Sequence, residues 1–250
     1  MSSVTGRMIE DELTRLGICR GDVLEVHSSL KSFGHVEGGA PAVISALENV
    51  VGQEGTVFMP ALALSPELPL TDEDKAMGLT VKIRKLPEDE VHTAMGLIAD
   101  TFRGMADTKT GPGVFRTTGW GKHAEEAVTG GLSYAINNGG KAVLFGVDIY
   151  KLTAMHYMEG NTPEGITKVF EPSDAVKKIY PDEQWLIETG HPPVKAWYTI
   201  QKIAYDRGLI KEGKVGSCKI MTFNIKDVVS IYADELVRDP YGLWGMERPE

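Results

Sequence analysis

The stretch LTAMHYMEG, residues 152–160, carries three polar side chains at intervals of three: Thr153, His156 and Glu159. They lie on one face if the segment is helical. A glutamate beside a histidine can hold the imidazole in one tautomer and raise its basicity, which leaves the other ring nitrogen free to take a proton. A threonine one turn earlier can donate a hydrogen bond to a developing oxyanion. Spacing alone leaves two interpretations open: a general base with its partners, or an ordinary buried histidine in an apolar stretch.

A second polar group lies between a predicted strand, residues 22–26, and a predicted helix, residues 40–52. The loop that joins them contains an imidazole, hydroxyls and a glycine pair, namely His27, Ser28, Ser29, Ser32, Gly38 and Gly39. A helix N-terminus offers free N–H groups and a positive dipole end, and glycines allow close backbone approach. The loop matches neither a Walker sequence nor a dinucleotide-binding fingerprint. A phosphate cradle and a serine-containing surface loop therefore both fit these residues.

Apolar periodicity predicts the elements that must position these residues. We expect strands at residues 22–26, 55–62 and 141–147, helices at residues 5–16, 40–52, 94–105, 121–130 and 196–210, and a strand followed by a helix within 218–239. The order strand, loop, helix, strand is typical of an α/β layered fold with parallel pairing. Residues 65–90 are charged and rich in proline, which indicates a surface excursion or a lid over a site. Without a repeat or a low-complexity linker, we predict one domain over residues 1–250.

Composition limits the partners and the chemistry. The chain has 250 residues and a net charge of −9, which disfavours a nucleic-acid partner and is compatible with a cationic substrate. Two isolated cysteines, Cys19 and Cys218, give neither a disulfide framework nor zinc-ligand spacing. The sequence has no H-E-x-x-H, no Cys/His cluster and no G-x-S-x-G, so we expect no metal and no α/β-hydrolase triad. We find no signal-peptide core and no membrane-length apolar run, and we expect a cytoplasmic protein.

Four motifs in order resemble the aminoglycoside 3-N-acetyltransferase family. Residues 22–62 carry the strand, H-S-S-L-x-S-x-G, G-G helix start and G-T-hydrophobic-hydrophobic-x-P of its N-terminal signature. Residues 93–103, TAMGLIADTFR, resemble the next helix of the family, with Asp100 in place of a glutamate. Residues 141–160 match its strand followed by T-x-x-H-x-x-E, and residues 208–223 match its late G-x-V-G-x-(A/C) element. The resemblance covers most of the chain, from about Met8 to Asp234.

The resemblance implies an α/β fold, with one three-layer α/β/α domain around a central mixed, mostly parallel sheet. It implies transfer of acetyl from acetyl-coenzyme A to the 3-amino group of an aminoglycoside, without a metal. His156 would be the general base, Glu159 its support, and Thr153 would lie beside the thioester carbonyl. Asp100 would face the acceptor. The coenzyme A site would be lined by His27, Ser28, Ser29, Leu30, Ser32, Val36, Gly38 and Gly39.

Two segments depart from the family pattern where the acceptor and the thiol arm of the coenzyme would lie. Residues 113–126 keep Arg116, Thr117 and the Trp-Gly pair but lack the H-P and the following serine, and residues 70–89 lack a T-P-S run. Three functions therefore stay open: an aminoglycoside acetyltransferase, an acyltransferase of the same fold with another amine or hydroxyl acceptor, and a non-catalytic coenzyme A-binding protein. The oligomeric state, a homodimer included, also stays open.

Overall fold

A sheet of seven strands forms the centre of the computed structural model, which describes residues 3–248. The strands follow the spatial order β4-β5-β2-β1-β6-β9-β8. They are β1 (Val23–Ser28), β2 (Thr56–Pro60), β4 (Lys109–Thr110), β5 (Thr117–Gly121), β6 (Lys141–Phe145), β8 (Lys211–Val215) and β9 (Cys218–Asn224). Strand β1 lies in the middle of the sheet, and its four central residues are buried. Residues at the end of β1 are therefore held by neighbours on both sides.

The sheet is mixed, as predicted, but the expectation of mostly parallel pairing is wrong. Strand β1 pairs in parallel with β2 and with β6. The other four pairs of the sheet, β2 with β5, β4 with β5, β6 with β9 and β8 with β9, are antiparallel. The parallel part corresponds to the strand-helix-strand unit that the sequence predicts. The outer strands return beside their neighbours in the opposite direction, as in the β8–β9 hairpin, and need no helical crossover.

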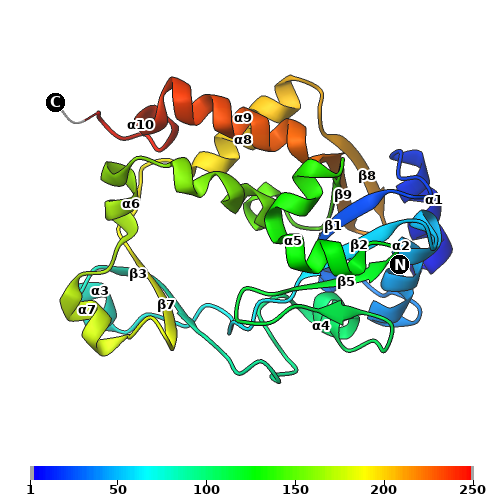
Figure 1. The fold of residues 1–250 in the computed structure, drawn as a ribbon, viewed down its shortest axis with the longest axis horizontal. Coiled ribbons are helices and arrows are strands. Elements are labelled where there is room, and N and C mark those ends of the chain that lie inside the picture. The colour runs from blue at the N-terminus through cyan, green and yellow to red at the C-terminus, as the bar shows by residue number, and fades with distance from the viewer. Residues whose placement is uncertain (1–2, 249–250) are drawn as a thin grey trace.

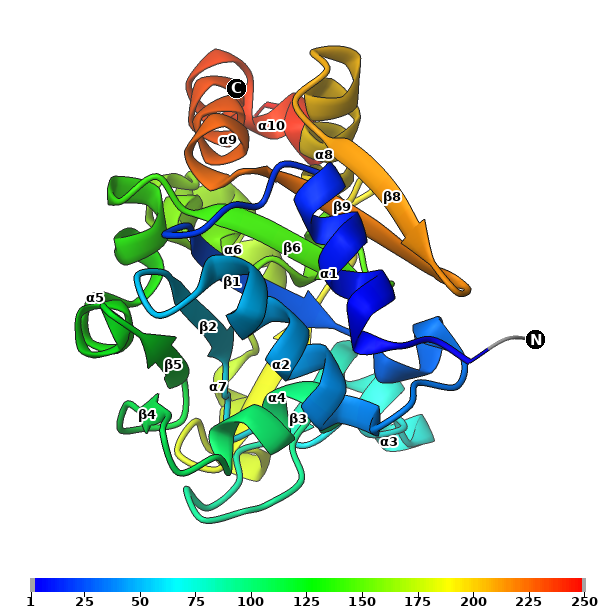
Figure 2. The same ribbon diagram turned by 90° about the vertical axis from the view of Figure 1, so that its right-hand side faces the viewer.

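Helices cover both faces of the sheet and give the three predicted layers (Figure 1). On one face lie α1 (Gly6–Arg15), α2 (Gly39–Val51) and α4 (Leu97–Arg103), whose buried residues join Leu24 and Val26 in one core. Figure 2 shows α1 and α2 in front of the strands β1 and β6. On the other face lie α5 (Ala124–Asn137), α8 (Ala196–Asp206) and α9 (Ile225–Arg238), which share a second core with Leu144. The short helix α10 (Pro240–Leu243) packs on α9.

A small second sheet stands apart from the main one, at the lower left of Figure 1. Strands β3 (Leu79–Arg84) and β7 (Trp185–Thr189) pair antiparallel, with α3 (Asp72–Ala76) and α7 (Asp174–Ile179) beside them, and α6 (Glu164–Phe170) precedes α7 in the chain. The core of this β3–β7 unit consists of Leu79, Val176 and Ile187. The predicted excursion at residues 65–90 thus contains α3 and β3, and its sheet is completed by a much later segment. That residues 65–90 act as a lid over a site remains a prediction.

Most predicted elements are present, but several ends are shifted by glycine. The helix expected at 94–105 begins only after Gly96, whose φ is 87°, and the helix expected at 196–210 ends before Gly208, whose φ is 68°. The helix expected at 121–130 continues to Asn137 across a kink at Gly131. The strands β3, β4, β5, β7 and β8 and the helices α3, α6 and α7 were not predicted, because short or charged segments show little apolar periodicity. Within residues 3–248, the structure contains no helix long and apolar enough to cross a membrane.

A carboxyl group on α2 makes the stability of this fold depend on pH. Burial, together with the negative charge of Asp107, raises the pKa of Glu48 to about 7, and its Oε1 is buried without a partner. A raised carboxyl pKa means that the folded state binds more protons than the unfolded state between the two pKa values. Stability is therefore lost as the pH rises from about 4.5 towards 7, and the loss is complete above that.

We expect Glu48→Gln to stabilise the protein at pH 8 and to have a smaller effect at pH 5. Because the side chain is only half-buried, solvent screening limits the gain to about 1 kcal/mol. Urea unfolding at both pH values measures it. Glu54→Gln is the matched control, because the exposed Glu54 pairs with Lys122 and has a lowered pKa, so it should bring no gain at pH 8. An equal gain for Glu48→Gln at both pH values would contradict the explanation.

Candidate active site

Alternation along β1 places two polar side chains on one face of the sheet. Leu24 and Val26 belong to the core beneath α1, α2 and α4, so Glu25 and His27 point to the opposite face. The strand neighbours in register with Glu25 belong to the core beneath α5 and α9. Glu25 is 1% exposed and His27 is 7% exposed. A carboxyl group and an imidazole thus lie inside an apolar layer, where burial costs free energy unless polar groups are hydrogen-bonded.

The Glu25 carboxyl group joins β1 to the segment that follows β6. Its Oε1 lies 2.9 Å from Nε2 of His27. The same oxygen accepts hydrogen bonds from the Thr153 hydroxyl at 2.7 Å and from the backbone N–H of Ala154 at 3.1 Å. The backbone N–H of Thr153 lies 3.3 Å from Nε2 of His27. The structure therefore brings together Thr153 and His27, two predicted site residues from distant segments, through a glutamate that was not predicted.

The predicted catalytic segment is helical, but as a 3₁₀-helix. After β6 come η2 (Ile149–Lys151) and η3 (Thr153–Asn161). A 3₁₀-helix has three residues per turn, so side chains three apart are aligned more closely than in an α-helix. Thr153, His156 and Glu159 consequently occupy successive turns of η3 on one side. The single hydroxyl hydrogen of Thr153 points to Glu25, and its expected role at an oxyanion stays a prediction.

His156 and Glu159 form an ion pair on this helix. Nδ1 of His156 lies 2.8 Å from Oε2 of Glu159, and the two side chains are 49% and 50% exposed. The imidazole also meets the ring of Trp197 from α8 edge-to-face, with ring centroids 4.9 Å apart. Trp197 is buried and fixes one side of the imidazole. Since the Glu159 contact uses Nδ1, the free ring nitrogen is Nε2, which suits a base that receives a proton from solution or substrate.

Carboxylates and aromatic rings surround the exposed side of this pair. Burial raises the pKa of Glu188 on β7, and the negative charges of Glu159 and Glu67 raise it further, while His156 opposes them. The pKa of Tyr150 is raised by burial and by the same carboxylates, Glu188 first. Tyr150 stacks on Tyr198, with ring centroids 5.4 Å apart. The β3–β7 unit therefore places an acidic side chain close to His156, in surroundings that favour a cation.

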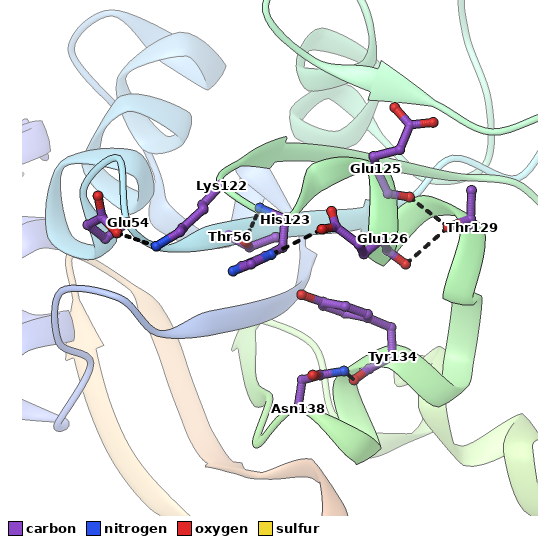
Figure 3. A network of polar contacts seen from close by, with 9 residues as sticks. All are labelled: Glu54, Thr56, Lys122, His123, Glu125, Glu126, Thr129, Tyr134 and Asn138. Atoms are coloured by element: carbon purple, nitrogen blue, oxygen red, sulfur yellow. Dashed lines mark hydrogen bonds and ion pairs between the residues drawn. The ribbon is translucent and has the colours of Figure 1, made fainter.

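A second histidine–glutamate pair shows that spacing alone does not identify a site. Figure 3 shows His123 beside Glu126, with Lys122 paired to Glu54 and Tyr134 nearby. Nδ1 of His123 lies 3.3 Å from Oε1 of Glu126, again at a separation of three residues. This pair lies where β5 ends and β2 begins, because the N–H of His123 bonds to Thr56. His27 lies at the other edge of the sheet, where the parallel strands end.

The loop after β1 packs on the hairpin between β8 and β9. Within η1 (Leu30–Phe33), the Ser32 hydroxyl lies 2.7 Å from the Ser29 carbonyl and 3.0 Å from the Cys218 sulfur. Ser217 donates to the Ser32 carbonyl at 2.6 Å. Gly146, just after β6, has a φ of 65°, and a Cβ there would come within 2.0 Å of the Ser32 hydroxyl. Only glycine fits at residue 146, so the loop is held tightly against the end of β6.

A pocket of about 500 Å³ opens beside this contact. It is lined by Ser32, Gly146, Val147, Asp148, Gln201, Ser217, Lys219 and Met221. Ser28 pairs with Phe145, the residue before Gly146, so the pocket begins next to the end of β1. Of the residues predicted to bind the coenzyme, Ser32 lines the pocket. Leu30 packs against the core beneath α2, and Ser28 and Ser29 are partly exposed at the strand end.

At the start of α2, one backbone N–H is already bonded and another is absent. Gly38 caps the helix with φ at 78°, and no side chain caps it. The N–H of Gly39 already bonds to the carbonyl of Val36 at 3.1 Å, and Pro41 has no N–H. Val36 itself is buried in the core and forms a bridge with Val4. Any contact of Val36 with a ligand would therefore involve its backbone.

The carboxylate of Asp100, which we expect to face the acceptor, is hydrogen-bonded to another residue of the protein. Its Oδ2 accepts the backbone N–H of Thr93 at 2.9 Å, and its Oδ1 accepts the Thr93 hydroxyl at 2.7 Å. The carboxylate thus holds the turn that leads into α4, and contact with an acceptor stays a prediction. As for metals, residues 3–248 contain no group of three His, Cys, Asp or Glu side chains that could hold an ion.

Three residues of this site could not be found by motif: Glu25, Glu188 and Trp197. The signal for Glu25 is a charged residue in the apolar strand VLEV, two positions before a histidine. Glu188 and Trp197 give no comparable signal, because their places beside His156 depend on how β7 and α8 return to the site.

The protein has a layered α/β fold, and a histidine–glutamate pair lies on the helical segment that follows the parallel strand β6. The family model described as aminoglycoside 3-N-acetyltransferase matches residues 26–236, and the chain belongs to this family. It is 30% identical over 180 residues to aminoglycoside N(3)-acetyltransferase III of Salmonella sp., a match that covers 62% of this chain and 60% of that enzyme. The match thus spans less than two thirds of that relative.

Two solved structures show the same fold. Aminoglycoside acetyltransferase AAC(3)-IVa in complex with apramycin has a TM-score of 0.70 and 21% identity, covering 96% of this chain and 95% of that one. AAC-IIIb in a binary complex with CoASH has a TM-score of 0.69 and 18% identity, covering 99% of this chain and all of the other.

Proposed function

We propose that this protein transfers the acetyl group of acetyl-coenzyme A to an amine of an aminoglycoside. The observation that carries the proposal is the His156–Glu159 pair, which is half-exposed and lies within an acidic and aromatic surface. Relatives in the family are named for this activity, and the solved structures of the same fold hold apramycin or coenzyme A. Together they support the same reaction at this site.

On the acceptor side, the proposed partner is a polycation. Burial raises the pKa of Glu188, and the negative charges of the nearby Glu159 and Glu67 raise it further. Such mutual repulsion is relieved when ammonium groups bind between carboxylates. The Tyr150 ring stacks on Tyr198 and already holds the Lys195 ammonium group 4.8 Å from its centroid, so this aromatic surface attracts cations. These features favour a cationic aminosugar over a neutral amine.

On the coenzyme side, the 500 Å³ pocket and the end of β1 offer a path for the pantetheine arm. Ser32 connects the pocket to the His27 loop. Lys219 supplies a cation at the pocket, although it also pairs with Glu212. We assign His27, Ser28, Ser29, Leu30 and Ser32 to this side of the reaction, with Gly38 and Gly39 at the start of α2.

In the proposed reaction, His156 acts as the general base. The neutral amine nitrogen of the acceptor attacks the thioester carbonyl carbon, and its proton passes to Nε2 of His156. Glu159, bound to Nδ1, stabilises the imidazolium that forms. The carbon–sulfur bond then breaks, and the imidazolium returns its proton to the departing thiolate. The products are the N-acetylated aminoglycoside and coenzyme A, and every step uses residues of this chain.

The direct test is thiol release from acetyl-coenzyme A with a panel of aminoglycosides and simple amines. We expect turnover with at least one aminoglycoside and a product that carries one added acetyl group by mass spectrometry. Cys19 is an exposed free thiol, so a protein blank or a Cys19→Ser variant is needed when a thiol reagent is used. Turnover with other amines alone would reject an aminoglycoside as the acceptor. Binding of coenzyme A without turnover on any amine would reject catalysis.

A further inference from the structure

We propose that Glu25 is a positioning residue that fixes the tautomer of His27 and anchors the first turn of η3, an inference that rests on the proposed acetyl transfer. The observation is the convergence of three polar groups on one buried oxygen. Oε1 of Glu25 contacts Nε2 of His27, the Thr153 hydroxyl and the Ala154 N–H, at 2.9, 2.7 and 3.1 Å. These groups come from β1 and from the helix that carries His156.

The hydrogen-bond pattern determines where the protons are. The Thr153 hydroxyl and the Ala154 N–H both donate to Oε1, so this oxygen carries no hydrogen and acts as an acceptor. Nε2 of His27 lies closer to Oε1, at 2.9 Å, than to the Thr153 nitrogen, at 3.3 Å. The Thr153 N–H also points to Nε2, so the two contacts favour opposite tautomers, and the shorter one, to the carboxyl oxygen, is attractive only if Nε2 carries a hydrogen. His27 is therefore held with Nε2 protonated, which leaves Nδ1 as its accepting nitrogen.

This tautomer has a use at the coenzyme side of the site. In residues 3–248, Nδ1 of His27 has no hydrogen-bond partner, and it is absent from the polar atoms that are fully buried without one. A neutral imidazole with a free Nδ1 can accept a hydrogen bond from an amide N–H of the pantetheine arm. The opposite tautomer would present a donor there and would repel that N–H. Glu25 thus selects an acceptor at the end of β1.

The same carboxylate fixes the helix that carries the proposed base. The first N–H groups of a helix have no acceptor within the helix. Glu25 accepts the hydrogen bond of one of them, the N–H of Ala154. The Thr153 side chain gives a second attachment. His156 lies one turn further along η3, so a shift of the first turn moves the imidazole away from Trp197. Oε2 of Glu25 has no partner and is buried, so the residue is not explained by its contribution to stability alone.

The tautomer can be measured without any substrate. In protein labelled with ¹⁵N-histidine, the ring nitrogen shifts of His27 should show Nε2 protonated and Nδ1 unprotonated near neutral pH, with the signal assigned by its loss in His27→Gln. In Glu25→Gln, which keeps the shape but not the charge, we expect a mixture of tautomers. The matched control uses the exposed His123–Glu126 pair. Glu126→Gln should change the ring nitrogen shifts of His123 and leave those of His27 unchanged.

Kinetics separate positioning from a merely structural role. We expect Glu25→Gln to lower kcat roughly 10- to 100-fold, as loss of a carboxylate behind a functional imidazole commonly does. The KM for the aminoglycoside should change little, because Glu159 and Glu188 are untouched. Thr153→Ser should retain more activity than Thr153→Val, because it keeps the hydroxyl that reaches Glu25.

The outcomes are distinct. An Nδ1-protonated His27 in the unmodified protein overturns the inference, whether or not the variants fold. Unchanged kcat and tautomer in a folded Glu25→Gln variant also overturn it. An Nε2-protonated His27 in a protein that acetylates no aminoglycoside supports the positioning of His27 while it contradicts the proposed function, so failure of the two ideas can be told apart.

Discussion

Acetyl transfer is expected to fall roughly 10²- to 10⁴-fold in kcat when His156 is replaced by alanine or asparagine, while coenzyme A still binds. His156 is the only histidine in residues 3–248 that has a glutamate partner beside the acidic and aromatic surface of the β3–β7 unit. Its removal leaves the amine without a base that can take its proton during attack. Coenzyme binding should survive, because the pocket near Ser32 is formed by other elements.

The matched control for this prediction is His123→Ala. His123 forms the same kind of pair, with Glu126, at a similar exposure, but at the opposite edge of the sheet (Figure 3). Steady-state rates and calorimetric coenzyme A binding should be measured for both variants under the same conditions. His123→Ala should behave like the unmodified protein. Near-normal turnover in His156→Ala would remove His156 from the mechanism, and loss of coenzyme binding in that variant would point to a disturbed fold.

Asp74→Ala is expected to unfold the β3–β7 unit locally, at a cost of about 3 kcal/mol. The Asp74 carboxylate is fully buried, and it accepts hydrogen bonds from Lys82 at 2.8 Å and from the Tyr180 hydroxyl at 2.6 Å. These partners hold the pKa of Asp74 well below its usual value, with Lys82 the larger cause. The three residues join α3, β3 and the end of α7. Alanine would leave the Lys82 ammonium group, which is 12% exposed, without its partner.

Hydrogen exchange of the amides in β3 and β7 measures this loss. The apolar core of the unit is small, with three buried residues among those described and a few partly buried ones around them, so little else compensates. A depressed carboxyl pKa stabilises the folded state above the unfolded value, so the loss is fully present at pH 7 and disappears in acid. Asp72→Ala is the control, since the side chain of Asp72 is 99% exposed on the same helix. Faster exchange throughout the main sheet, or no change in β7, would contradict a local role.

The parallel centre of the fold and the loop after β1 could be predicted from sequence because the signals there are local. The apolar run of β1, proline in the first turn of α2 and the apolar strand β2 define one strand-helix-strand unit, and the structure pairs β1 with β2 in parallel as expected. The helical segment around His156 could also be predicted, since its spacing of three matches a helical turn.

The remaining features depend on contacts between distant segments. Strand β7 pairs with β3 across about a hundred residues, and neither strand carries a strong apolar alternation. The antiparallel pairing of β5 with β2 likewise depends on the direction in which the chain comes back to the sheet, and the composition of β5 does not indicate it. The partners of Glu25 lie on η3, which contacts the end of β1 only in the folded protein. The sequence therefore shows a charged residue in an apolar strand but not the groups that it binds.

The 3₁₀ winding of η3 also sets the distance between Thr153 and Glu159. A 3₁₀-helix rises about 2 Å per residue, so Glu159 lies about 12 Å along the axis from Thr153, whereas an α-helix would give about 9 Å and turn Glu159 about 120° away. Thr153 meets the Glu25–His27 pair at one end, and Glu159 meets the charges of the β3–β7 unit at the other. Substitutions that favour α-helical winding between them would shorten this span. They would separate the two ends of the site from each other even if every polar residue were retained.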